Sequence, residues 1–419
     1  MHSVITPIQI RKLADRFKST QECSFGCLGA LFALHLFGCV SLCEGVRQLA
    51  WSPSVSALQN ATAQFSTNRF MRRLRQGILR RIGNDLNGER YCFAVDDVPV
   101  ECYGKNIFRI GNWPSHGGGL MRGQRILVLA LIDRQRGVAL PLAFELLTNT
   151  KDPEHRKATD VAVDLVKLIL EERFPRLTVV FDSWFDSVRL MDELDNLEVT
   201  FVIEAKSNRK VKRCAAPGAK WRTWKDILHG RIKRGVKLAP TANSKENRGT
   251  RYVAEGRVCI NGRDAMLKAA AMYNKPSVGK FFAVYVSNNL NLSGAELWSS
   301  SRARWHIEEA FRMLKQDFSF GKLPLQGRTG TEVSICFPFA LLISFQLDRS
   351  EWTTKNTTIG SAVKEVRERS LNQIHDEYSR GSKRMSPLVL KSRRKIERNT
   401  KKPVNPTANE IHAWKTNAA

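Results

Sequence analysis

Three charged side chains between positions 304 and 315 are spaced so that they could act together on one substrate. Arg304, Glu308 and Lys315 lie at steps of four and seven residues. At roughly 100° per residue, these steps bring all three within about 60° on one helix face. Arg304 and Glu308 alone would stabilise the helix only weakly, because an exposed Arg–Glu pair at this spacing contributes only about 0.3 to 0.5 kcal/mol. A solvated helix edge and one wall of an active site are both open interpretations.

Aspartates interrupt two apolar runs that are typical of buried β-strands. Asp96 and Asp97 occur in FAVDD, and Asp182 occurs in VVFD. A buried carboxylate is costly without a partner or a metal ion, although each aspartate could also cap the loop or helix that follows it. Two such strands, together with Glu308, favour a shared site. Three carboxylates in one place supply the oxygen ligands that Mg²⁺ prefers.

The chemistry expected of this site is the cleavage and joining of phosphodiester bonds. Two Mg²⁺ ions held by shared carboxylates can activate a water or a DNA 3′-hydroxyl and stabilise the leaving oxygen. Arg304 and Lys315 would hold the scissile strand by its phosphates.

The composition predicts a nucleic-acid partner. Lys and Arg total 67 against 40 Asp and Glu, for a formal net charge of +27. Such an excess produces a positive field that attracts polyanions. Basic clusters recur at 69–81, 206–213 and 391–403. We find no lipidation motif or basic amphipathic anchor, so no membrane partner is expected.

The nine cysteines are odd in number and scattered, and no secretory signal is recognisable. This usage favours a reduced, intracellular protein, cytoplasmic and associated with the nucleoid. Cys23, Cys27, Cys39 and Cys43 have a spacing that suggests zinc. The stretch between them is strongly apolar, however, so buried thiols that pack between helices are the favoured interpretation.

Residues 1–88 are expected to form the elements that recognise DNA. They are predicted to be helical, and a basic helix follows a tight turn. Short helices joined in this way are compatible with a helix-turn-helix DNA reader.

The catalytic residues are expected on a mixed sheet. In 89–206 we predict three consecutive strands, then helix, strand, helix and strand, with helices packed on the sheet. The predicted strands are 91–100, 124–133, 137–146, 177–185 and 199–206. This order is the one found in ribonuclease H-like domains.

The remaining chain divides into three predicted parts. Residues 207–290 are expected to be a β-rich insertion, and 291–350 a second part of the catalytic domain, in which one helix from near 295 carries Glu308. Residues 351–419 are expected to be a basic C-terminal tail. The chain is thus an α/β protein of mixed α+β type, in keeping with two to four units for 419 residues.

With these motifs, the chain resembles DDE-type bacterial insertion-sequence transposases. FAVDDVPVECYGK matches the first Asp motif, VVFDSWFDS the second, and RARWHIEEAFRMLKQ the Glu motif. The last follows the family signature Y-x2-R-x3-E-x6-K through Arg304, Glu308 and Lys315. Ser301 stands where the signature has Tyr.

The resemblance implies a ribonuclease H-like catalytic domain that performs cut-and-paste transposition. Asp96, Asp182 and Glu308 would be catalytic and would bind two Mg²⁺ ions, with Mn²⁺ as a substitute. Asp96 is preferred to Asp97 because related motifs place the ligand first in an acidic pair. The partners implied are double-stranded DNA, as terminal inverted repeats and target, and a second copy of the chain in a synaptic homodimer.

Two other functions remain open. The chain could be a DNA-binding protein of the same fold that is catalytically inactive or repurposed. It could instead be a ribonuclease H-like nuclease that only hydrolyses DNA.

Overall fold

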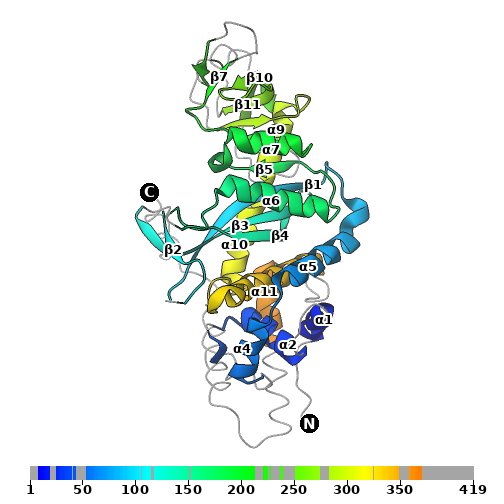
Figure 1. Ribbon diagram of the computed structural model, residues 1–419. Coiled ribbons are helices and arrows are strands. Elements are labelled where there is room, and N and C mark those ends of the chain that lie inside the picture. The colour runs from blue at the N-terminus through cyan, green and yellow to red at the C-terminus, as the bar shows by residue number, and fades with distance from the viewer. Residues whose placement is uncertain are drawn as a thin grey trace, which may run out of the picture.

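The computed structural model describes most of the chain between residues 8 and 369. The described residues are 8–18, 25–39, 41–43, 53–104, 106–114, 118–150, 152–212, 220–224, 227, 236–238, 251–273, 283–323, 325–348 and 358–369. Figure 1 shows the N-terminal helices at one end, a sheet in the middle and further strands at the other end.

Five strands in the middle of the molecule form a mixed sheet in the order β4-β3-β1-β5-β6. Its strands are β1 (Tyr91–Glu101), β3 (Leu120–Asp133), β4 (Val138–Leu146), β5 (Val179–Phe181) and β6 (Phe201–Glu204). The first three pair antiparallel, and β5 and β6 run parallel to β1. This is the predicted fold class: a ribonuclease H-like mixed sheet with flanking helices.

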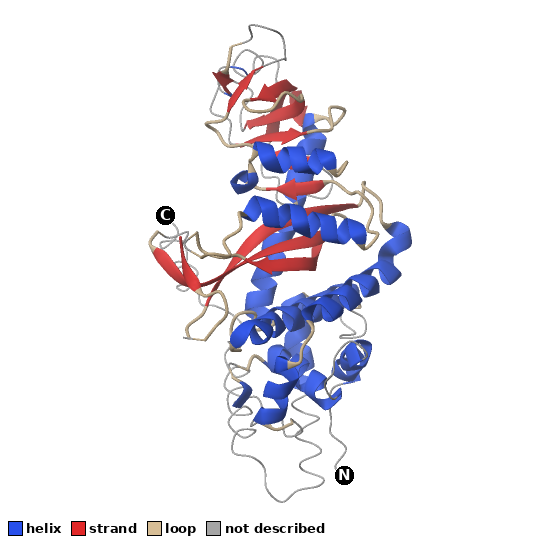
Figure 2. Cartoon of the chain, viewed as in Figure 1, coloured by secondary structure: helices blue, strands red, loops and turns tan. Residues whose placement is uncertain are grey.

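Helices cover both faces of this sheet. α6 (Ala158–Glu171) and α7 (Val188–Asn196) lie over one face, while α9 (Gly294–Ala303) and α10 (Trp305–Asp317) run behind it (Figure 2). Strands buried on both faces are apolar along their whole length. Accordingly, the eight residues at the end of β3 are all buried. The sheet therefore offers a rigid edge for polar side chains placed at strand ends.

The segment predicted as a β-rich insertion continues the same sheet. β12 (Ala283–Ser287) pairs antiparallel with β6 through Tyr285 and Glu204. The other strands extend the sheet outward: β7 (Lys210–Lys212), β8 (Arg222–Thr223), β9 (Val236–Leu238), β10 (Arg251–Ile260) and β11 (Leu267–Tyr273). Including the short edge strand β2 (Gly111–Pro114), the described residues form a sheet of twelve strands. The domain boundaries themselves stay a prediction.

The N-terminal helices pack around a long apolar helix, α11 (Gly327–Leu347). They are α1 (Ile8–Lys18), α2 (Phe25–Phe37), α4 (Val55–Ala63) and α5 (Thr67–Ile82), the last followed by a short 3-10 turn, η1 (Gly83–Asp85). Phe32, Phe65 and Phe70 all contact Phe337 of α11. The apolar core therefore continues from these helices into the sheet.

α11 is long and apolar enough to cross a membrane by composition alone. However, 89% of its most apolar stretch is buried inside the protein. This burial is what the core helix of a folded domain shows.

The helix expected from near 295 is two helices. α9 and α10 meet at Arg304, and a capping box of Ser293 and Glu296 starts α9. The prediction of one continuous helix was wrong because α9 packs on β6, β11 and β12, whereas α10 packs on β4 and β1. Strands of a twisted sheet differ in direction, so the two helices follow different lines. The break places Arg304 at the corner between them.

Part of the expected C-terminal tail is helical. Within 351–419, residues 359–369 form a helix. Its Ala362, Val363 and Val366 are buried, and Arg367 donates a 2.5 Å hydrogen bond to the carbonyl of Asp317. This stretch therefore packs against the end of α10. Residues 370–419 lie outside the described residues.

The three N-terminal cysteines that the structure describes do not share one environment. Cys27 and Cys39 are buried and Cys43 is exposed, whereas Cys23 lies outside the described residues. The Cys27 thiol lies 3.8 Å from the carbonyl of Ala57 on α4.

Candidate active site

Asp96 and Asp182 lie side by side on adjacent parallel strands. Ala94 of β1 pairs with Val180 of β5, so two residues further on Asp96 stands beside Asp182. Side chains two apart share a face of the sheet. The fold therefore brings together two aspartates that are separated in the sequence by β3, β4 and α6.

Arg304 lies among the acidic side chains. It donates to Asp96 Oδ2, and its Nη2 lies 2.8 Å from Glu308 Oε1. Burial lowers the pKa of Arg304, but the charges of Asp96, Glu308 and Asp182 outweigh burial and raise it overall. The structure thus unites four of the five predicted site residues, with a guanidinium at their centre.

Burial disfavours the ionised form of both aspartates. Asp96 is 7% exposed, and burial raises its pKa to about 7, an effect that Arg304 opposes and Asp182 reinforces. Burial also raises the pKa of Asp182. A carboxylate of this kind favours a cation beside it.

Asp182 also caps the chain that follows it. The Trp184 N–H donates a 2.9 Å hydrogen bond to Asp182 Oδ1, at the start of the 3-10 turn η2 (Ser183–Phe185). The capping role of this aspartate is therefore observed, and its role as a metal ligand stays a prediction. The cap fixes the carboxylate against Asp96.

Asp97 has a different partner. The Arg125 guanidinium donates to both Asp97 oxygens, one at 3.0 Å, and stacks 4.3 Å above the Trp184 ring. The side chains of Asp96 and Asp97 leave the strand on opposite faces, and Asp96 is the one that contacts Arg304. This geometry favours Asp96 as the candidate ligand.

Lys315 lies apart from the Arg304 cluster. Burial lowers its pKa, and the charge that opposes this effect is Asp97. Lys315 and the exposed Lys322 line a cavity of about 400 Å³ between the end of β1, the β2–β3 hairpin and the end of α10. Gly321, at φ +78°, lets the chain pass here, because a Cβ would lie 2.2 Å from Val100 Cγ1.

Glu204, which ends β6, is a further residue of the site that was not predicted from the sequence. Phe181 pairs with Ile203, so Glu204 stands one strand beyond Asp182 on the same sheet edge. Burial raises its pKa, with Arg304 opposing and Asp182 reinforcing the effect. The run FVIE has the same pattern, an apolar strand ending in a carboxylate, that identified Asp96 and Asp182.

Tyr285 was also missed, and it contacts Ser301. Its side chain is buried and hydrogen-bonds with that of Ser301. Burial raises the pKa of Tyr285 to about 12, against the effect of that hydrogen bond. A phenol hydroxyl from β12 therefore contacts Ser301.

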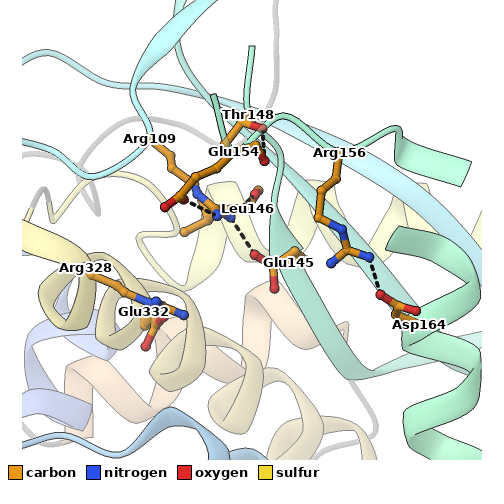
Figure 3. Close-up of polar contacts among 9 residues, drawn as sticks. All are labelled: Arg109, Glu145, Leu146, Thr148, Glu154, Arg156, Asp164, Arg328 and Glu332. Atoms are coloured by element: carbon orange, nitrogen blue, oxygen red, sulfur yellow. Dashed lines mark hydrogen bonds and ion pairs between the residues drawn. The ribbon is translucent and has the colours of Figure 1, made fainter. Parts of the chain in front are cut away.

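A separate set of ion pairs lies at the end of β4, two strands from β1, and within the first turns of α11 (Figure 3). Arg109 donates 2.6 Å hydrogen bonds to Glu145 and to the Leu146 carbonyl at the end of β4. Arg328, at the start of α11, lies 3.0 Å from Glu332. Because Arg109 precedes β2, these bonds anchor the β2–β3 hairpin.

The donor chemistry of the site fits a divalent cation, although Arg304 fills that role here. In the described part of the chain, no three His, Cys, Asp or Glu side chains are grouped to hold a metal ion. Glu308 faces Arg304 instead. Asp96 and Asp182 are adjacent, largely buried carboxylates, which are the oxygen ligands that Mg²⁺ and Mn²⁺ take. The neighbouring guanidinium shows that the position favours positive charge.

Comparison with known proteins identifies one family. Residues 87–343 match the family model described as a transposase DDE domain. No curated protein matches the sequence.

Several solved structures are similar over parts of the chain. The piggyBac transposase synaptic complex with hairpin DNA aligns over 93% of this chain and 84% of its own, at 12% identity and a TM-score of 0.46. The Mos1 mariner paired end complex with Mn aligns over 38% and 53%, at 13% identity and 0.17. Endonuclease V from Ciona intestinalis, bound to inosine-containing DNA, aligns over 56% and 85%, at 15% identity and 0.23.

Proposed function

The chain belongs to the family of transposases with a DDE domain, which spans residues 87–343, and we propose that it cuts transposon ends and joins them to target DNA. The observation that supports this activity is the adjacency of Asp96 and Asp182, with Glu308 and Arg304 brought to them by α10. Cut-and-paste transposition is the proposed outcome.

Asp96, Asp182 and Glu308 are the proposed ligands of two Mg²⁺ or Mn²⁺ ions. When bound, such ions lower the pKa of a coordinated water or hydroxyl and stabilise the leaving oxygen. The protein side chains bind the DNA and hold the ligands in place. Arg304 and Lys315 contact phosphates of the scissile strand, and the Asp182 cap and the paired strands hold the ligands in register.

Double-stranded DNA is the proposed partner, as terminal inverted repeats and as target. The net charge of +27 supports this proposal. A homodimer would bring two transposon ends together.

Substitution of the ligands tests the proposal. We expect Asp182→Asn and Glu308→Gln each to abolish Mg²⁺-dependent cleavage of DNA carrying the element's ends, while affinity for that DNA stays within a few-fold. Cleavage is measured on labelled DNA and affinity by gel shift. Glu89→Gln, which changes an exposed acid just before β1, is the matched control and should cleave like wild type.

Three outcomes separate the proposal from its alternatives. Retained cleavage in both ligand variants would refute the assigned residues. Tight end binding by a wild-type protein that never cleaves in Mg²⁺ or Mn²⁺ would identify a repurposed DNA-binding protein. Cut products that never join to a second DNA would identify a nuclease.

A further inference from the structure

Glu204 differs from the other carboxylates of the site because it has no direct partner. Asp96 and Glu308 contact Arg304, and Asp182 accepts from a backbone N–H. Within the described residues, the side chain of Glu204 forms no hydrogen bond or ion pair, although its backbone pairs with β12. Yet its side chain is half-buried at the same sheet edge.

A half-buried carboxylate without a partner is unfavourable, because desolvation is not repaid by a hydrogen bond or a counter-ion. The neighbouring Tyr285 lies opposite Glu204 across β6 and β12, but its hydroxyl bonds to Ser301 instead. The cation that influences Glu204 is Arg304, close enough for each to alter the other's pKa. Glu204 is therefore placed to pair with the Arg304 guanidinium, although the two do not form an ion pair in this structure.

Arg304 has the complementary problem. Its guanidinium donates a hydrogen bond to Asp96 Oδ2. The other oxygen, Asp96 Oδ1, accepts a 2.9 Å hydrogen bond from the Asp97 N–H. A divalent cation on Asp96 would have to share these oxygens and would repel the guanidinium. Four carboxylates act on Arg304: Asp96, Glu308, Asp182 and Glu204. If the first three bind the cation, Glu204 is the one that stays available to pair with the guanidinium.

Resting on the proposed function, we propose that Glu204 is a positioning residue that receives Arg304 when Asp96 and Asp182 bind a divalent cation. In the cation-free protein Arg304 substitutes for the missing charge. On cation binding the guanidinium moves one strand over, from Asp96 toward Glu204. It then stays at the edge of the site, where a DNA phosphate can reach it.

Binding of Mn²⁺ tests this inference without DNA or activity. Free Mn²⁺ is measured by electron paramagnetic resonance during titration of the full chain. We expect Glu204→Gln to weaken Mn²⁺ binding by about tenfold, equivalent to ~1.4 kcal/mol, because Arg304 loses the partner that stabilises the loaded site. Glu198→Gln, an exposed acid just before β6, is the matched control and should bind like wild type.

A double-mutant cycle shows whether Glu204 acts through Arg304. Arg304→Ala alone should bind Mn²⁺ more tightly than wild type, because the competing cation is gone. In that background, Glu204→Gln should change affinity by less than about twofold, because the guanidinium through which Glu204 acts is gone. A tenfold loss that persists without Arg304 would make Glu204 a direct ligand and overturn the inference.

Two further measurements distinguish the inference from the proposed function. Without Mn²⁺, Glu204→Gln should melt at or above the wild-type temperature, since it removes an unpaired charge. A lower melting temperature, or unchanged Mn²⁺ affinity, would overturn the role of Glu204 and leave the cation site intact. Mn²⁺ binding by Asp182→Asn equal to that of wild type would instead overturn the cation site itself.

Discussion

Asp96 is a carboxyl group held in an environment far from that of water. It is almost fully buried in the middle of β1 and contacts one guanidinium. Its neighbours Asp97 and Asp182 disfavour its charge, whereas Arg304 favours it. The balance leaves Asp96 close to half-protonated at neutral pH, so its readiness to bind a cation depends on pH.

Mn²⁺ affinity of the wild-type protein should fall as the pH is lowered from 8 to 6. The pKa of Asp96 is raised to about 7, so below that pH its carboxyl holds a proton that a metal ion must displace. Affinity should fall on the order of tenfold per pH unit below 7 and level off above it. Titration calorimetry at several pH values measures the effect. Constant affinity between pH 5.5 and 7 would contradict the protonation of Asp96.

Single residues of the site were predictable where local pattern carries the signal. Asp96 and Asp182 stand out because each is a charge in an apolar strand, and Arg304 and Glu308 because their spacing fits one helix face. Glu204 has the same strand pattern, but its relevance depends on the pairing of β5 with β6, which the sequence does not display. The hydrogen bond between Tyr285 and Ser301 was not predictable, because it depends on where β12 lies in the sheet.

At the scale of elements, similar charges in one helix have different roles. α5 carries several arginines in the basic run 69–81, and Arg69, Arg72 and Arg80 are exposed. Arg75 is buried instead. It binds Glu172 with hydrogen bonds of 2.6 and 2.7 Å and donates to the Leu142 carbonyl at 3.0 Å. This arginine fastens α5 to the sheet.

Arg75→Ala should destabilise the fold by about 3 to 5 kcal/mol, because it leaves Glu172 partly buried without its counter-ion. Arg72→Ala, on the exposed side of the same helix, should change stability by less than about 0.5 kcal/mol. Urea denaturation followed by circular dichroism measures both. Equal stability of the two variants would show that Arg75 does not hold α5 in place.

Most elements follow from periodicity, and the exceptions have a common cause. The strands β1, β3, β4, β5 and β6 and the helix α6 lie where apolar patterns predict them. The break between α9 and α10 was not predictable, because both halves have helical spacing and Arg304 itself keeps helical angles, φ −58° and ψ −32°. The break is imposed by the different strands on which the two helices pack.

At the scale of the whole molecule, positive charge and sheet continuity set how DNA can be held. The excess of 27 positive charges is spread over several clusters, while the acidic site lies within the sheet. Lys315 and Lys322 line the cavity next to that site. Continuity of β6 with β12 was not predictable, because strand order depends on contacts far apart in sequence.

Lys315→Ala should weaken DNA binding and make its salt dependence shallower. Each phosphate contact contributes about one unit to the slope of log K against log salt concentration. We expect the slope to fall by about one, measured by fluorescence anisotropy from 50 to 300 mM salt. Lys167→Ala, on α6 over the opposite face of the sheet, is the matched control. An unchanged slope would place Lys315 away from the DNA backbone.

The contact between Asp96 and Arg304 joins residues 208 positions apart. During synthesis, β1 leaves the ribosome long before α9 and α10 exist. β6 must also wait for β12 before its outer edge is paired. Contacts of such long range form late in folding. The basic N-terminal helices are thus made well before the contact between Asp96 and Arg304 can form, so a nascent or truncated chain that ends before Arg304 carries positive charge without the cluster that Arg304 joins.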